Sequence, residues 1–188
     1  MKAFAAVVPA LLALAFLASP TPASAADVPP IKASTTSSAK DFDFLVGTWK
    51  VHNRRLKARH VKSQAWDEFP GDLTLRLILG GLGNVDEVAF PTKGWSGLTL
   101  RLFNPETKLW RIYWVNSRDG LMQEPVVGSF NGKVGEFFGD DTDDGKPIYV
   151  RYRWDATQAE RPHWEQAFSL DRGKTWETNW TTDFTRVK

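Results

Sequence analysis

The chain has 188 residues, and its 24 Lys and Arg against 22 Asp and Glu give a net charge of +2. It contains no cysteine, which excludes disulfides, thiolate metal sites and a lipid anchor on cysteine. Without Lys2, Lys32, Lys40 and Asp27, the remaining 148 residues hold 21 basic and 21 acidic side chains. A neutral domain argues against nucleic acid as a partner, because neutralising phosphates needs a net basic surface.

The first 25 residues have the pattern of an export signal. Lys2 precedes an unbroken apolar run over residues 3–17, and Ala23-Ser24-Ala25 forms a small-residue cleavage site. The run is shorter than the roughly 20 residues that a membrane span needs, and no later segment approaches that length. We therefore predict a cleaved signal peptide over residues 1–25, a periplasmic or secreted location and no transmembrane segment.

Residues 26–40 are mostly Pro, Ser, Thr and Ala. Such a composition is too polar to bury a core of its own, and predicts a disordered linker. The folded domain is then expected over residues 41–188, which is long enough for one sizeable core.

The domain alternates between two faces with the period of a β-strand, and no segment keeps a helical period for three turns. The runs are Leu73, Leu75, Leu77 and Leu79; Leu98, Leu100 and Leu102, opposite Thr99 and Arg101; Trp110, Ile112 and Trp114; and Ile148, Val150, Tyr152 and Trp154. Turn sequences such as Asn131-Gly132 and Asp144-Gly145 separate the runs. We predict an all-β fold, an antiparallel up-and-down barrel of about ten strands, because closure removes exposed edges.

Both ends of the domain favour a closed barrel. If Trp49 points inward, so do Val51, Asn53 and Arg55 on the same strand. By the same alternation Trp176, Trp180, Phe184 and Arg186 share the inner face of the last strand. Closure would bring Arg186 onto the ring of Trp49, where a cation–π contact would seal the barrel.

These features carry a family resemblance. Gly47-x-Trp49 on the first strand, with a basic residue on the last, resembles the lipocalin-like proteins of the calycin superfamily. Further phrases resemble exported bacterial lipocalin-like proteins of unknown function; they include Phe42-Asp43-Phe44, Tyr113-Trp114-Val115, residues 125–130, residues 164–169 and residues 176–180. The resemblance implies the barrel fold and brings no established activity with it.

Other motifs have structural explanations. Residues 169–176 match an Asp-box, which builds a hairpin turn rather than a catalytic site. The three histidines lack the spacing of a zinc or haem site, and the Asp140–Asp144 run lacks the ligand order of a calcium loop. The glycines around Gly81 precede a strand rather than a helix, which favours a wide turn over a phosphate loop. We therefore expect no metal and no cofactor.

The aromatic interior remains as the candidate site. Inward aromatic rings combined with a few polar groups are typical of a small-molecule pocket. The expected ligand-binding residues are Trp49, Asn53, Arg55, Trp110, Trp114, Asn116, Tyr152, Trp154, Gln166 and Trp180. We expect a monomer or weak homodimer that binds a small hydrophobic or amphipathic organic ligand, with Arg55 and Tyr152 fixing a carboxylate or carbonyl. Two alternatives stay open: an enzyme in which Tyr152 is the acid or base and Arg55 stabilises negative charge, and a structural or interaction module with a filled lumen.

Overall fold

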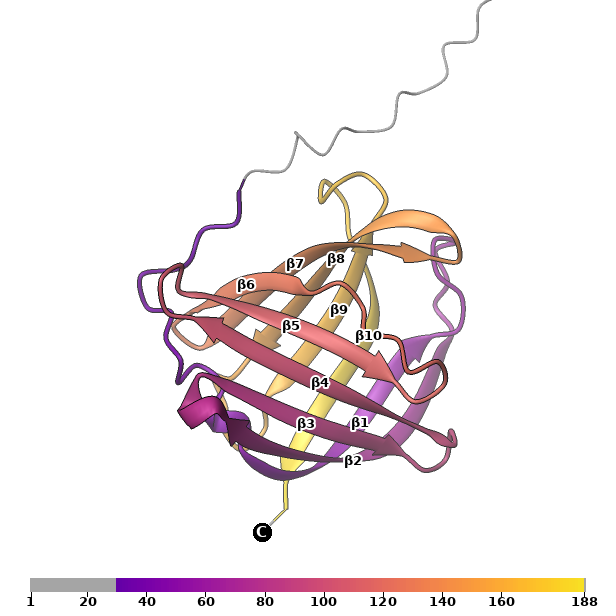
Figure 1. Ribbon diagram of the computed structural model, residues 1–188. Coiled ribbons are helices and arrows are strands. Elements are labelled where there is room, and N and C mark those ends of the chain that lie inside the picture. Colours follow the sequence, from indigo (N-terminus) through magenta and orange to yellow (C-terminus); the bar gives the residue numbers. More distant parts are fainter. Residues whose placement is uncertain (1–29, 188) are drawn as a thin grey trace, which may run out of the picture.

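The computed structural model describes residues 30–187 and shows ten antiparallel strands (Figure 1). The predicted signal peptide and residues 26–29 lie outside the described residues. The strands are β1 (Gly47–Leu56), β2 (Trp66–Ile78), β3 (Gly83–Phe90), β4 (Trp95–Asn104), β5 (Leu109–Asn116), β6 (Val126–Asn131), β7 (Val134–Asp143), β8 (Lys146–Asp155), β9 (His163–Ser169) and β10 (Glu177–Arg186). Two short 3-10 turns, η2 (Asp43–Leu45) and η3 (Leu79–Gly81), accompany them. Residues 30–187 contain no helix that is long and apolar enough to cross a membrane.

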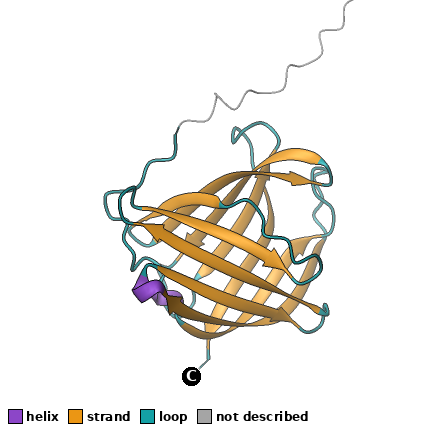
Figure 2. Cartoon of the chain, in the orientation of Figure 1, coloured by secondary structure: helices purple, strands orange, loops and turns teal. Residues whose placement is uncertain are grey.

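The sheet closes on itself. Each strand pairs with its neighbours in the sequence, and β1 pairs with both β2 and β10, so no strand has a free edge (Figure 2). The prediction of an all-β, antiparallel up-and-down barrel of about ten strands is confirmed. At the seam Trp49 is the register partner of Arg186, whose Cζ lies 4.1 Å from the centre of the Trp49 ring.

One end of the barrel is closed by the segment that precedes β1. Phe42 and Leu45 are 1% and 0% exposed, and the ring of Phe42 meets the ring of Trp110 edge-on at 5.0 Å. The indole N–H of Trp49 donates to the carbonyl of Leu45 at 2.8 Å. The aromatic residues around η2 therefore form a packed floor beneath the lumen.

Residues 34–40 include two turns that hydrogen-bond to the barrel, whereas the composition predicted a linker without structure of its own. The backbone N–H of Ser34 donates to Oγ of Ser129 at 2.9 Å, and the indole of Trp110 donates to the carbonyl of Ser38 at 3.3 Å. Composition measures how much apolar surface a segment can bury, and it does not register hydroxyl and carbonyl groups that bond to a neighbouring strand.

The side of β4 that faces the lumen is the opposite of the one predicted from its leucines. Thr99 and Arg101 are buried and Leu98 is 38% exposed. The reason is Gly97: a Cβ there would lie 1.9 Å from the Trp114 ring, so this inward ring occupies the space above the glycine. Gly97 therefore faces the lumen, and the alternation places Thr99 and Arg101 inside with it.

Leu77 and Leu79 are 44% and 67% exposed, because β2 ends at Ile78 and the chain turns into η3. Leu77 keeps the predicted face, opposite the buried Asn84 in the register, but it lies at the end of the barrel. The face predicted for Trp176 was wrong. Trp176 lies outside the barrel, its ring 5.9 Å from that of the outward-facing Tyr149. A bulge between Thr178 and Trp180 interrupts the alternation of β10, which is why Trp180 points inward and Trp176 does not.

Candidate functional site

The barrel holds a cavity of about 350 Å³. It reaches from the aromatic interior to the end of the barrel at which the β1–β2, β3–β4, β5–β6 and β7–β8 connections lie. The rim of the cavity is formed by exposed residues of these connections and of the strand ends next to them. They include Arg118, Asp119 and Gln123 on one side and Thr142 on the other. This volume lies at the low end of the roughly 300–1,000 Å³ range of small-molecule pockets.

Trp180 on β10 is the centre of the aromatic wall of the cavity. Its ring lies 5.8 Å from Trp164, 6.1 Å from Trp95 and 6.2 Å from Trp114, with edge-on geometry in each case. Edge-on pairs at these separations are favourable for aromatic rings. The wall is thus a set of mutually supporting rings from β4, β5, β9 and β10.

Asn53 holds that wall in place rather than facing a ligand. Its Oδ1 accepts hydrogen bonds from the indole of Trp180 at 3.1 Å and from the hydroxyl of Thr182 at 2.9 Å. Its Nδ2 donates to the carbonyl of Phe69 at 3.3 Å. Asn53 lines the cavity as expected of a site residue, but its hydrogen bonds are already made within the protein.

Arg55, two residues further along β1, is a cation without an anionic partner. Its Cζ lies 4.9 Å from the centre of the Trp180 ring, and within residues 30–187 its guanidinium makes no side-chain hydrogen bond or ion pair. The cross-strand carboxylate of Asp67 pairs instead with Lys93, at 2.6 Å. Burial, and next the positive charges of Arg59 and Arg118, lower the pKa of Arg55. An anion in the cavity would offset both effects.

Tyr152 on β8 supplies a hydroxyl from another wall. Its ring meets Trp164 edge-on at 5.1 Å, and burial raises the pKa of the phenol, so the hydroxyl keeps its proton. Beside it Gln166 donates from Nε2 to Oδ1 of Asn179 at 2.7 Å, which fixes the orientation of its amide. Tyr152 is therefore a hydrogen-bond donor at neutral pH and not a base.

Eight of the ten expected ligand-binding residues line this one cavity: Asn53, Arg55, Trp114, Asn116, Tyr152, Trp154, Gln166 and Trp180. Asn116 lies at the rim, where its amide donates to Asp119 at 3.0 Å. Trp49 and Trp110 do not line the cavity; both are 0% exposed and belong to the floor around η2. Their inward direction was correctly inferred, but sequence alternation does not say how deep in a barrel a side chain lies.

The sequence analysis missed the polar inner wall of the cavity. Asp86 on β3, with Thr99 and Arg101 on β4, lines the cavity although none of the three was selected. The available signal was Trp95 at the start of β4: once this ring is taken as inward, Thr99 and Arg101 follow by alternation. The leucines on the other face of β4 instead indicated that the opposite side of the strand points inward.

The motifs set aside as structural lie outside the aromatic wall. Asp171 of the Asp-box accepts hydrogen bonds from the hydroxyl and the backbone N–H of Thr175, at 2.6 and 2.8 Å, which builds the turn before β10. In the run of aspartates, Asp143 pairs with Arg59 at 2.6 Å and with His60 at 2.9 Å. Residues 30–187 contain no cluster of three or more His, Cys, Asp or Glu arranged to hold a metal ion.

The sequence was also compared with known proteins. No protein-family model matches the chain, and no curated protein matches it.

Proposed function

We propose that this protein is an exported, lipocalin-like barrel of the calycin type that binds a small, partly apolar organic anion in its lumen, as a monomer or weak homodimer. The closed ten-strand meander supports the fold assignment. So does the contact between Trp49 of the Gly47-x-Trp49 motif and Arg186 of the last strand. The pattern of residues 1–25 supports export.

The observation that carries the binding proposal is Arg55. A cation that is mostly buried against an indole, in a cavity and without a carboxylate partner, is an incomplete arrangement in the free protein. A carboxylate of the ligand would complete it through charge-assisted hydrogen bonds, and the rings around Trp180 would cover the apolar part of the ligand.

The two alternatives are less well supported. A filled lumen is hard to reconcile with a cavity of about 350 Å³. An enzyme that uses Tyr152 as its base would need a lowered pKa, whereas burial raises the pKa of this phenol.

Arg55 and Arg54 provide a matched test, because they are neighbours on β1 that point to opposite faces. Arg54 is outside, 3.1 Å from Glu68, with 43% of its side chain exposed. We expect 2-naphthoate to quench the tryptophan fluorescence saturably. Arg55→Gln should weaken its binding by about 1.5–3 kcal/mol, the contribution of a hydrogen bond to a charged group, and Arg54→Gln should leave it unchanged.

The neutral analogue 2-naphthamide separates charge recognition from packing. The affinity of 2-naphthamide should differ less than about twofold between the wild type and Arg55→Gln, because the neutral amide has no carboxylate to make a charge-assisted hydrogen bond with Arg55. Equal losses for the acid and the amide would make Arg55 a structural residue. Absence of any saturable quenching by the acid would contradict the binding proposal.

A further inference from the structure

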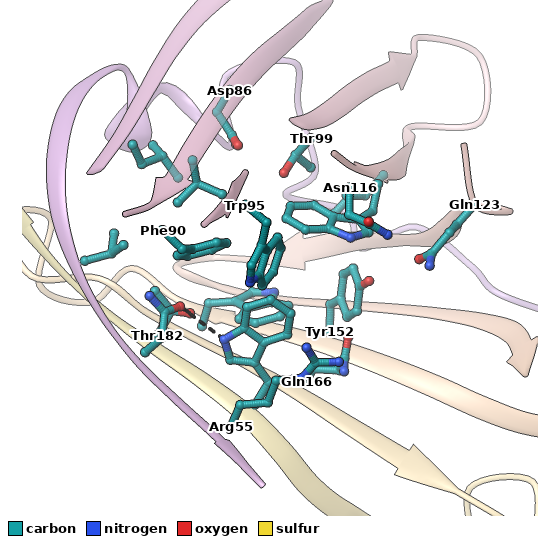
Figure 3. Close-up of a pocket in the computed structure, with 18 of the residues that line it drawn as sticks. Arg55, Asp86, Phe90, Trp95, Thr99, Asn116, Gln123, Tyr152, Gln166 and Thr182 are labelled. Atoms are coloured by element: carbon teal, nitrogen blue, oxygen red, sulfur yellow. Dashed lines mark hydrogen bonds between the residues drawn. The ribbon is translucent and has the colours of Figure 1, made fainter. Parts of the chain in front are cut away.

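The inner wall of the cavity carries a buried ion pair that the aromatic wall does not use. The side chains of Asp86 and Arg101 are 0% and 4% exposed, and Nη1 of Arg101 donates to Oδ2 of Asp86. The same Nη1 donates to Oδ1 of Asn84 at 3.1 Å. Thr99, the cross-strand partner of Asp86, adds a hydroxyl to this wall. Figure 3 shows Asp86 and Thr99 on one side of the lining residues and Arg55 on the opposite side.

This ion pair leaves hydrogen-bonding capacity unused. Oδ1 of Asp86 and Nε of Arg101 are buried and have no hydrogen-bond partner within residues 30–187. Both residues line the cavity. The guanidinium of Arg101 is held from the floor by Phe42 and Trp154, whose ring centres lie 5.0 and 5.6 Å from its Cζ. Buried polar atoms without partners are rare in native proteins, and here one acceptor and one donor belong to residues that line the cavity.

The charge of this wall differs from that of the wall near the rim. Asp86 and Arg101 neutralise each other, so a second ion placed against them would lose its hydration without a net opposite charge to replace it. A neutral group that carries a proton can instead donate to Oδ1 of Asp86. Arg55 on the other side remains the place for a negative charge.

We propose that the inner wall is a recognition site for a neutral hydroxyl group, so that the ligand is a small hydroxylated aromatic acid. Its carboxylate lies at Arg55, its ring lies among the tryptophans, and its hydroxyl donates to Asp86. The cavity volume of about 350 Å³ suits one or two rings. This inference rests on the proposed function and specifies the ligand class of the same cavity.

Three series of probes of increasing length test it in the wild-type protein by calorimetry at neutral pH. The parent acids of the three series are benzoate, cinnamate and 2-naphthoate. Each series compares the unsubstituted acid with its hydroxyl and methoxy derivatives, substituted at the position farthest from the carboxylate. That position is C4 in benzoate and cinnamate and C6 in 2-naphthoate. In the series whose length fits the cavity, the hydroxyl compound should bind at least about tenfold more tightly than the unsubstituted acid, because a site with a buried polar group discriminates strongly against an analogue that lacks its partner. The methoxy compound, which cannot donate, should show no such gain.

The double variant Asp86→Leu/Arg101→Met tests which residues give this preference. It removes both charges together, a change that is often tolerated in a core, whereas Asp86→Asn alone would leave a buried cation unpaired. The tenfold advantage of the hydroxyl should disappear, so that the hydroxyl compound and the unsubstituted acid bind this variant with affinities equal within about twofold. Glu87→Gln, at the neighbouring exposed position of β3, is the control and should change neither.

The outcomes separate the two proposals. If the acids bind and Arg55→Gln weakens them, but the hydroxyl brings no gain in any series, the inner-wall inference is wrong and the proposed function stands. If no acid of any series binds, both are wrong. If the double variant does not fold, the comparison of the hydroxyl and methoxy compounds in the wild-type protein still decides whether a donated hydrogen bond strengthens binding.

Discussion

Asn53 and Trp180 are joined by a buried hydrogen bond of 3.1 Å between the indole N–H and Oδ1, across the seam where β1 meets β10. The same oxygen accepts from Thr182 at 2.9 Å. One amide thus links the seam of the barrel to the central ring of the aromatic wall.

Asn53→Leu should therefore destabilise the protein although leucine fills a similar volume. The indole of Trp180 and the hydroxyl of Thr182 would be left buried without this acceptor, at a cost of about 2–4 kcal/mol for the two groups together. Urea unfolding followed by tryptophan fluorescence measures the change. His52→Leu, at the exposed neighbouring position of β1, should cost less than about 0.5 kcal/mol. Similar urea midpoints for the two variants would contradict the structural role of Asn53.

Arg186 should be a second determinant of barrel closure. Its guanidinium lies over Trp49 and donates to the carbonyls of Val46 and Phe44, at 2.8 and 2.6 Å. Arg186→Ala should lower the free energy of unfolding by about 1–3 kcal/mol, because the cation–π contact and both hydrogen bonds are lost. A loss no larger than that of the control described next would exclude this closing role.

The control for Arg186→Ala has to be an arginine whose guanidinium does not lie over an aromatic ring. Arg151 does not qualify although it faces outward, because its Cζ lies 4.9 Å from the centre of the Trp176 ring. Arg111 on β5 is exposed, and Arg111→Ala should shift the urea midpoint by an amount equivalent to less than about 0.5 kcal/mol.

The sequence was sufficient for the fold because its signals are local and repeated. Alternation on β1, β5 and β8 places Trp49, Trp110 and Trp154 inside, and the turn residues separate the strands. The alternating pattern gave the wrong face where one extra residue in a strand shifted the alternation by one position. The bulge after Thr178 reversed the face of Trp176, and nothing in residues 176–180 marks a bulge by composition.

The site was only partly predictable for a related reason. The inward direction of Arg55 and Tyr152 follows from period 2, whereas depth along the barrel depends on strand tilt and on η2, which fills one end. Burial of Arg101 could not be inferred from hydrophobicity, because a charged residue is usually outside unless a partner such as Asp86 is placed opposite by the register.

Acid should destabilise the native state through carboxylates whose pKa is lowered by folding. Hydrogen bonds from Thr175 hold the pKa of Asp171 at about 2. The hydrogen bond from Arg59 lowers the pKa of Asp143. A carboxyl group with a lowered folded-state pKa contributes stability above its unfolded value of 3.8, and that contribution is lost as the pH falls through the folded value. Urea midpoints should therefore decrease between about pH 4 and pH 2.

Thr175→Val tests the origin of this effect, since it removes the hydroxyl bond and keeps the backbone bond to Asp171. The pKa of Asp171, followed by NMR titration, should rise toward 3.8. Thr181→Val, on a strand position without a side-chain bond to Asp171, should leave it unchanged. A titration curve of Asp171 that is insensitive to Thr175→Val would assign the low pKa to another cause.

Tyr152 should remain protonated far into the alkaline range. Burial raises its pKa, and the negative charge of Asp141 acts in the same direction. The absorbance change of tyrosinate below about pH 11 should therefore be the same in the wild type and in Tyr152→Phe, because the buried phenol does not contribute while the barrel is folded. Tyr152→Phe should at the same time weaken 2-naphthoate by about 0.5–1.5 kcal/mol, the contribution of one neutral hydrogen bond, without changing the urea midpoint by more than the same amount. Loss of part of the tyrosinate signal below pH 11 in this variant would show that the phenol ionises readily, and would return Tyr152 to consideration as a catalytic base.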